Sequence, residues 1–261
     1  MTVEAVTPKM AQQWLGLTAG NRVVRKRRIE RYCRDRRAGN WYVTHQGIAF
    51  DSDGLLRDGH HRLEMIVATN LTTKMAVFRN VPSEGLTYID AGLARSSRDA
   101  LYMADKGNYS NTMMAVARGL FSFPGHSRSP LSDPTNTELV DRLARHGESL
   151  NYACAHLPHG ISGVSRSTRV LVARAWYSAD RERLSEFCVV VTSGVPQDPR
   201  ADLSGITFRN FLIKTAKNTG WALEEERYRK GQTALDSFLK RQPLEKLYGT
   251  PADLFPMPEE S

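Results

Sequence analysis

The residues best suited to binding or catalysis are the five in DGHHR, at positions 58–62. They follow an extended apolar pair, Leu55 and Leu56, and their last three residues open a helix-like run at 60–69. A glycine at a strand-to-helix turn lets backbone N–H groups approach a ligand closely. The helix that follows adds the positive end of its dipole. His61 and Arg62 add donors and charge, so the pattern suits a bound phosphate.

Two interpretations of this stretch stay open on the residues alone. In the first, Asp58 orients a histidine, holds a metal or accepts a proton beside the bound anion. In the second, Asp58 and Gly59 form an ordinary turn, while the histidines and Arg62 are solvated.

Positive charge is concentrated in one segment of the chain. The net charge is +8, and residues 22–37 hold nine Lys or Arg against two acidic residues, a net +7. Such a concentration is typical of a protein that binds a polyanion, most simply nucleic acid. A solvated helix face is the alternative. The candidate DNA-binding residues are Arg22, Arg25, Lys26, Arg27, Arg28, Arg31 and Arg34.

Composition excludes several classes of protein. With 261 residues and 41% hydrophobic residues, the chain can bury a real core. It has no apolar run near the ~18 residues of a spanning helix and no basic-then-apolar signal peptide, so we expect a cytoplasmic protein. The three cysteines are widely spaced and indicate buried thiols. Cys154, His156 and His159 lack a second ligand pair, so no zinc site is expected.

The first 95 residues predict a small α/β domain. Thr7 and Pro8 are typical of a helix start, and the basic segment predicts a second helix that ends near Gly39. The remaining expected elements are an extended segment at 41–50, a turn at Asp53–Gly54, a strand at 55–56, a helix at 60–69 and a strand at 72–81.

Residues 96–261 predict an all-α domain, so the fold class is α+β. Helices are expected at about 108–121, 136–147, 165–178, 181–193, 205–218 and 224–240. Arg166, Arg169 and Arg174 are expected on a solvated helix face, with a minor anion contact as the alternative. His146 and His159 are expected in loops or at helix ends.

The stretch LLRDGHHRLEMIVATN resembles the signature of the ParB/sulfiredoxin-fold superfamily, in which a strand ends in a G-x-x-R box and a helix begins. The box is similar to the GERR of ParB-type CTP-binding domains and the DGHHR of ParB-fold serine kinases. The surrounding order, through IAFDSDGLLRDGHHRL, MAVFRNV and YIDAGLARSSRDAL, resembles ParB-like proteins of phages and mobile elements. The resemblance covers about residues 7–104.

This resemblance implies that Gly59, His60, His61 and Arg62 cradle nucleotide phosphates. Arg95, in the segment that follows the last strand, is expected to reach the same phosphates. His60 stands where sulfiredoxins have their catalytic cysteine, which excludes that chemistry. The resemblance to kinases implies an acidic group that activates a hydroxyl. The candidate catalytic residues are Asp58, His60 and Glu30, with Glu64 as a further acid.

The sequence therefore predicts a ParB-like protein that binds a nucleoside triphosphate, ATP or CTP, and acts on or at DNA. The expected chemistry is NTP hydrolysis or phosphoryl transfer to a hydroxyl, with Mg²⁺ screening the phosphates. A ParB-like nuclease is the first alternative, and a non-catalytic DNA-binding regulator is the second. Partition of chromosomes or plasmids is not expected, because no clear helix-turn-helix motif follows residue 96.

Overall fold

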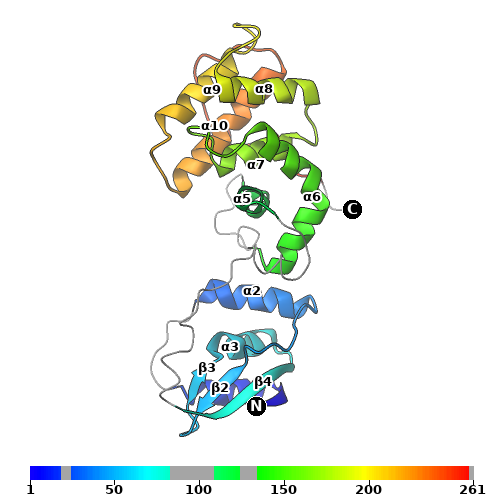
Figure 1. The fold of residues 1–261 in the computed structure, drawn as a ribbon, viewed down its shortest axis with the longest axis vertical. Helices are drawn as coiled ribbons and strands as arrows, with labels where there is room; N and C mark the ends of the chain where they lie inside the picture. The colour runs from blue at the N-terminus through cyan, green and yellow to red at the C-terminus, as the bar shows by residue number, and fades with distance from the viewer. Residues whose placement is uncertain (19–24, 83–108, 124–133, 259–261) are drawn as a thin grey trace. The chain divides into compact units, whose positions relative to one another are not determined.

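The chain forms two compact units, Met1–Ser96 and Ser97–Ser261. The computed structural model describes residues 1–18, 25–82, 109–123 and 134–258, whose elements are drawn in Figure 1. Within these ranges the first unit has a four-stranded sheet and three helices, and the second has six helices. The protein is thus mixed α/β, with its sheet in the N-terminal unit. The roles that the sequence suggests for the two parts stay predictions.

The sheet of the N-terminal unit has the strand order β1-β4-β2-β3. Its strands are β1 (Thr2–Val6), β2 (Ile48–Asp51), β3 (Leu56–Asp58) and β4 (Thr73–Val81). β4 pairs antiparallel with β1 and parallel with β2, while β2 pairs antiparallel with β3. All four residues of β2 are buried, as expected for an inner strand.

A tight turn joins β2 to β3. The Asp51 carboxylate accepts hydrogen bonds from the backbone amides of Asp53 (3.0 Å) and Leu55 (2.8 Å) and from Nε of Arg57 (2.6 Å). Gly54 has φ +75°, which a residue with a side chain adopts only at a cost. The polar side chain of Asp51 therefore fixes where β3 begins, and with it the position of the DGHHR stretch.

Three helices complete this unit: α1 (Pro8–Leu15), α2 (Lys26–Arg37) and α3 (His60–Thr69). α3 contacts both α1 and α2, and Figure 1 shows α2 lying across α3 on the side away from the sheet. Arg36 ties α2 to the start of β4 through Thr73 Oγ1 (2.8 Å) and the Thr72 carbonyl (2.9 Å). The shared core includes Cys33, Ile48, Leu63, Ile66 and Val77.

The second unit is built around α7. Its helices are α5 (Asn111–Gly119), α6 (Asn136–His156), α7 (Arg166–Ala175), α8 (Arg181–Ser193), α9 (Leu203–Lys214) and α10 (Trp221–Leu239). Every residue of α7 from Ser167 to Ala175 is buried, and α7 packs against α5, α6 and α10. In the described part of the chain, no helix combines the length and the apolarity needed to cross a membrane.

Buried arginines hold the helical unit together. Arg174, 3% exposed, donates to the carbonyls of Leu120 (2.9 Å), Phe123 (2.8 Å) and Phe255 (2.9 Å) and pairs with Asp253. It thereby joins α7, the end of α5 and the C-terminal segment. A guanidinium suits this role because it offers five donors in a fixed plane.

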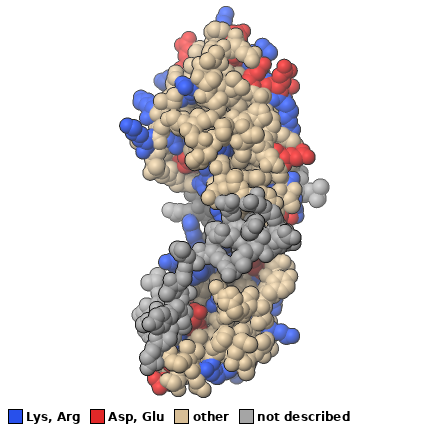
Figure 2. Space-filling model, in the orientation of Figure 1, with Lys and Arg blue, Asp and Glu red and all other residues tan. Residues whose placement is uncertain are grey.

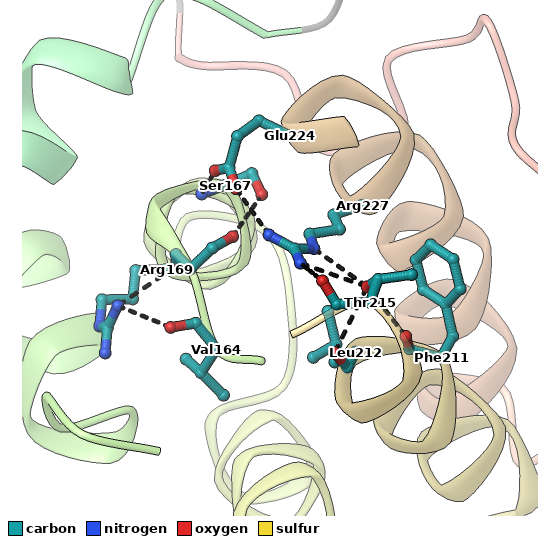
Figure 3. A network of polar contacts seen from close by, with 9 residues as sticks. Val164, Ser167, Arg169, Phe211, Leu212, Thr215, Glu224 and Arg227 are labelled. Atoms are coloured by element: carbon teal, nitrogen blue, oxygen red, sulfur yellow. Dashed lines mark hydrogen bonds and ion pairs between the residues drawn. The ribbon is translucent and has the colours of Figure 1, made fainter. Parts of the chain in front are cut away.

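A second arginine network joins the ends of α9 and α10 to α7 (Figure 3). Arg227 donates to the Thr215 carbonyl and to Glu224 Oε1 (2.9 Å). Glu224 Oε2 in turn accepts the amide N–H of Ser167 (3.1 Å). The Glu224 carboxylate therefore pairs with the buried Arg227 and also accepts a hydrogen bond from the first turn of α7.

Several local predictions are confirmed. Thr7 caps α1 by accepting the Met10 amide N–H (3.2 Å), α3 spans the predicted residues 60–69, and α8 spans the predicted 181–193. Of the extended segment predicted at 41–50, Ile48–Phe50 lie in strand β2 and residues 41–47 lie in no strand or helix. β1 was not predicted: its residues TVEAV alternate only weakly, and its hydrogen-bonding partner is distant in the chain.

The solvated face predicted for α7 is also wrong. Arg169 and Arg174 are buried, because each donates to carbonyl groups at helix ends that would otherwise lack partners. His146 lies within α6, not at its end, and its Nδ1 is 2.7 Å from the Tyr177 hydroxyl. The segment that holds Arg95, Ser96 and Asp99 lies outside the described residues.

Replacing Arg174 with Leu should lower the free energy of unfolding by about 3 kcal/mol, because three buried carbonyls and one carboxylate lose their donor. Denaturant unfolding followed by far-UV circular dichroism measures this. Arg200→Leu removes an exposed arginine and should change the free energy of unfolding by less than about 0.5 kcal/mol. Equal small losses for both variants would contradict the structural role of Arg174.

Candidate functional site

A cavity of about 390 Å³ lies where β3 turns into α3. All five residues 58–62 line it, together with residues from the first half of α2 and from β2 and β4. Its lining residues are Arg28, Tyr32, His45, Gln46, Gly47, Ala49, Asp58, Gly59, His60, His61, Arg62, Phe78 and Val81. The two segments that the sequence marked separately, the DGHHR stretch and the basic helix, therefore meet at one site.

Gly59 sets the geometry of the cavity. Its φ of +99° is left-handed, and a Cβ there would lie 2.9 Å from Cα of Ile48. Glycine alone satisfies both conditions, and the chain can turn from β3 into α3 within one residue. The Gly59 amide donates to Asp58 Oδ1 (2.7 Å), so this amide is already occupied. Among the described groups, none accepts the amide N–H of His60, the first residue of α3.

Arg62 is held across the cavity rather than projecting into solvent. It donates through Nη1 to the Gly47 carbonyl (3.1 Å) and through Nη2 to Gln46 Oε1 (2.9 Å). Asp58 Oδ2 lies 3.9 Å from Nη1. A Cβ at Gly47 would lie 2.1 Å from the Ala76 carbonyl oxygen, so glycine is required there too. The guanidinium is thus fixed in place and retains donors for a ligand.

The two histidines of the stretch have different partners. His60 Nδ1 is 3.5 Å from Thr18 Oγ1, and its Nε2 is 3.9 Å from Glu64 Oε1. His61 Nε2 accepts the backbone amide N–H of Arg25 (3.1 Å), so it acts as an acceptor there. This bond joins the start of α3 to the start of α2.

The first turn of α2 concentrates positive charge beside the cavity. Lys26, Arg27 and Arg28 occupy it, with no acidic residue, and Arg25 at the N-cap makes no side-chain capping bond. Cations near a helix N-terminus are unfavourable because the helix dipole is positive there. Arg28 lines the cavity, and its guanidinium has no partner among the described side chains. A bound anion would relieve this repulsion.

The structure brings together most, but not all, of the predicted site residues. Gly59, His60, His61, Arg62, Asp58 and Arg28 line the cavity. Glu30 is exposed on α2 and is not among the lining residues, so the structure does not place this candidate base at the site. Arg22 and Arg95 lie outside the described residues.

The basic residues of α2 divide into two groups. Arg25, Lys26 and Arg27 are exposed like Arg28, whereas Arg31 and Arg34 are half-buried and take part in interactions within the protein. A segment that looks uniformly basic in sequence is therefore exposed chiefly around its first turn.

Several lining residues were not predicted as site residues. Gln46 and Gly47 accept hydrogen bonds from Arg62, and His45 and Phe78 also line the cavity. A glycine directly before a buried strand was the available signal for Gly47. A smaller cavity of about 230 Å³ shares Tyr32, Gln46 and Arg62 with the first and is lined further by Trp41 and Tyr42, so an aromatic cavity adjoins the main one.

The described residues do not supply a resident metal centre. No group of three or more His, Cys, Asp or Glu in these ranges is arranged to hold a metal ion. Asp58 is the one carboxylate among the described residues that line the main cavity. A divalent cation would therefore need most of its ligands from a bound molecule and from water.

Comparisons with protein-family models, with curated proteins and with solved structures found no match to this chain. The resemblance to ParB-type domains therefore stays a prediction from the sequence motif.

Replacing Gly59 with Ala should lower the free energy of unfolding by roughly 2 kcal/mol or more, because it combines a positive φ with a close approach to Ile48. Gly54→Ala is the matched control: its φ is also positive, but no atom lies within 4 Å of its Cβ position. It should cost about 1 kcal/mol. Equal losses, measured by denaturant unfolding, would show that the close approach is unimportant.

Proposed function

We propose that the chain is a ParB-like protein that binds a nucleoside triphosphate, ATP or CTP, and acts on or at DNA. The main cavity would hold the phosphates. The observation that carries this proposal is the meeting of two helix starts, those of α2 and α3, at one cavity with Arg28 and Arg62.

The electrostatics of these helix starts support an anionic ligand. Neither α2 nor α3 has an acidic residue in its first turn or a side-chain capping bond. Neither first turn therefore offsets the positive end of its helix dipole with an acidic side chain of its own, although Asp58, directly before α3, binds the Gly59 amide. No described group accepts the His60 amide N–H. Phosphate oxygens would supply both the negative charge and the acceptors.

The dimensions of the site support a nucleotide more than a lone phosphate. A cavity of about 390 Å³ lies within the range of small-molecule sites, on the order of 300–1,000 Å³. The adjoining aromatic cavity begins at Tyr32 and Arg62, both of which also contact the first. A phosphorylated ligand with a planar group would use both.

The proposed chemistry is NTP hydrolysis or phosphoryl transfer to a hydroxyl. Asp58 would act as the base, because it is the one carboxylate among the described residues that line the cavity, which His60 also lines. Glu30 is not among the lining residues and is not assigned a role. Mg²⁺ would enter bound to the nucleotide phosphates, with its remaining ligands from water.

A nuclease is the second candidate, favoured by three imidazoles at the cavity. His45, His60 and His61 all line it, and imidazoles can serve as general acids and bases on phosphodiesters. In this version a DNA phosphodiester, not an NTP, would occupy the site.

DNA contact is proposed for the exposed start of α2, through Arg25, Lys26 and Arg27. These side chains are exposed and follow one another at the rim of the cavity that Arg28 lines. Contacts to the DNA backbone would make binding fall steeply with salt. A regulator without catalytic activity would show this salt dependence alone.

Arg28→Gln should weaken binding of an NTP with Mg²⁺ about tenfold, because it removes a charged donor from the cavity. Isothermal titration calorimetry on the full chain with ATP and CTP measures this. Arg37→Gln is the matched control: Arg37 lies in the last turn of the same helix, is exposed and does not line the cavity. The affinity of the Arg37→Gln variant for the nucleotide should stay within about twofold of wild type.

No binding of either nucleotide to the wild-type chain would contradict the proposed function. Given binding, phosphate release that is lost in Asp58→Asn identifies hydrolysis. Nicking of supercoiled plasmid without nucleotide binding would favour the nuclease, and DNA binding without either activity would favour the regulator.

A further inference from the structure

A separate cavity of about 280 Å³ lies wholly within the helical unit. It is formed by the first turns of α5 and α7 and by the loop that leads from α6 to α7. Three basic side chains line it: His159, Arg166 and Arg169. The remaining lining residues are neutral, so no acidic group of the described chain faces this cavity.

Arg169 carries a buried positive charge at the wall of this cavity. Only 5% of its surface is exposed, and burial lowers the pKa of its guanidinium. It donates to four backbone carbonyls, those of Leu157 (2.7 Å), Pro158 (2.7 Å), Val164 (3.2 Å) and Ser165 (3.3 Å). These bonds fold the 157–165 loop around it, but none of them neutralises its charge.

Three other buried arginines differ in this respect. Arg174 pairs with Asp253, Arg183 with Glu186 and Asp202, and Arg227 with Glu224. Arg169 has no carboxylate within ion-pair distance among the described residues. The Glu224 carboxylate, which acts on the Arg169 pKa after burial and the Cys154 thiol, is bound to Ser167 and Arg227 instead (Figure 3).

A buried charge is costly unless a counter-charge accompanies it. The described residues that line the cavity add the basic side chains of Arg166 and His159 and no acidic one. The Glu224 carboxylate binds the Ser167 amide in the first turn of α7, but Glu224 does not line the cavity. Over the helical unit's face shown in Figure 2, by contrast, basic and acidic side chains are interspersed.

We propose that this cavity binds a phosphate-sized oxyanion, as inorganic phosphate or as the phosphate of a mononucleotide. The ligand would supply the counter-charge that Arg169 lacks, with Arg166 and His159 as its direct contacts. A planar guanidinium favours a tetrahedral oxyanion over a halide, because two N–H groups can bind two oxygens. This site is independent of the proposed function of the N-terminal unit.

The test uses the full chain with the first site disabled by Arg28→Gln and Arg62→Gln. Calorimetry with inorganic phosphate, AMP and adenosine, at constant ionic strength in chloride, should still show binding of phosphate or AMP, and none of adenosine. Whichever anion binds identifies the source of the phosphate. Adding His159→Gln and Arg166→Gln should weaken that binding at least about tenfold. Arg169 is left unchanged because it holds the loop.

Two controls keep the outcome specific. Arg200→Gln, an exposed arginine of the same unit, should leave the affinity within about twofold. Arg166→Lys, which keeps the charge, should recover part of the lost affinity. Absence of phosphate and AMP binding in the Arg28, Arg62 background would overturn the proposal, as would binding unaffected by the His159 and Arg166 substitutions. Loss of NTP binding to the N-terminal unit would bear only on the proposed function.

Discussion

The N-terminal unit depends on the backbone of Gly59. Its left-handed conformation and its close approach to Ile48 allow β3 to turn into α3 without an intervening loop. The start of α3 is therefore held against β2, and His60, its first residue, lines the cavity. Arg62, one turn further on, reaches Gly47 and Gln46 just before the same strand. A longer turn would separate these groups, and the cavity would lose its shape.

The contact between α3 and α2 builds on this turn. His61 accepts the Arg25 amide, which places the start of the basic helix beside the start of α3. Two dipole ends of the same sign then face one space, together with Arg28. This arrangement costs free energy in the absence of an anion, and structural stability alone gives no reason for it. Functional sites are where such local conflicts are expected.

The chain uses arginine in two physically different ways. On the first turn of α2 arginines are exposed and lack acidic neighbours, so they raise the local potential. In the helical unit several arginines are buried and donate to backbone carbonyls, and Arg174, Arg183 and Arg227 also pair with a carboxylate. Arg169 combines both features, because it is buried like the second group and lacks a carboxylate like the first.

What the sequence could predict follows from the range of the interactions involved. The limits of α3 and α8 and the cap of α1 depend on neighbours within a few residues, and they were predicted. β1 depends on pairing with a strand about 70 residues away, and the burial of Arg169 and Arg174 depends on carbonyls of other helices; neither leaves a local pattern. At the site, DGHHR was recognisable, but Gln46, Gly47 and Arg28 join it only through the fold. Glu30 was a candidate base by residue type alone.

We propose that the DGHHR stretch and the start of α2 form one phosphate site. Hydrogen-exchange mass spectrometry of the full chain, with and without ATP or CTP and Mg²⁺, measures this most directly. We expect peptides covering residues 45–62 and 25–32 to become protected together at the same nucleotide concentration. Protection of only one of the two peptides, or of neither while nucleotide is bound, would contradict it.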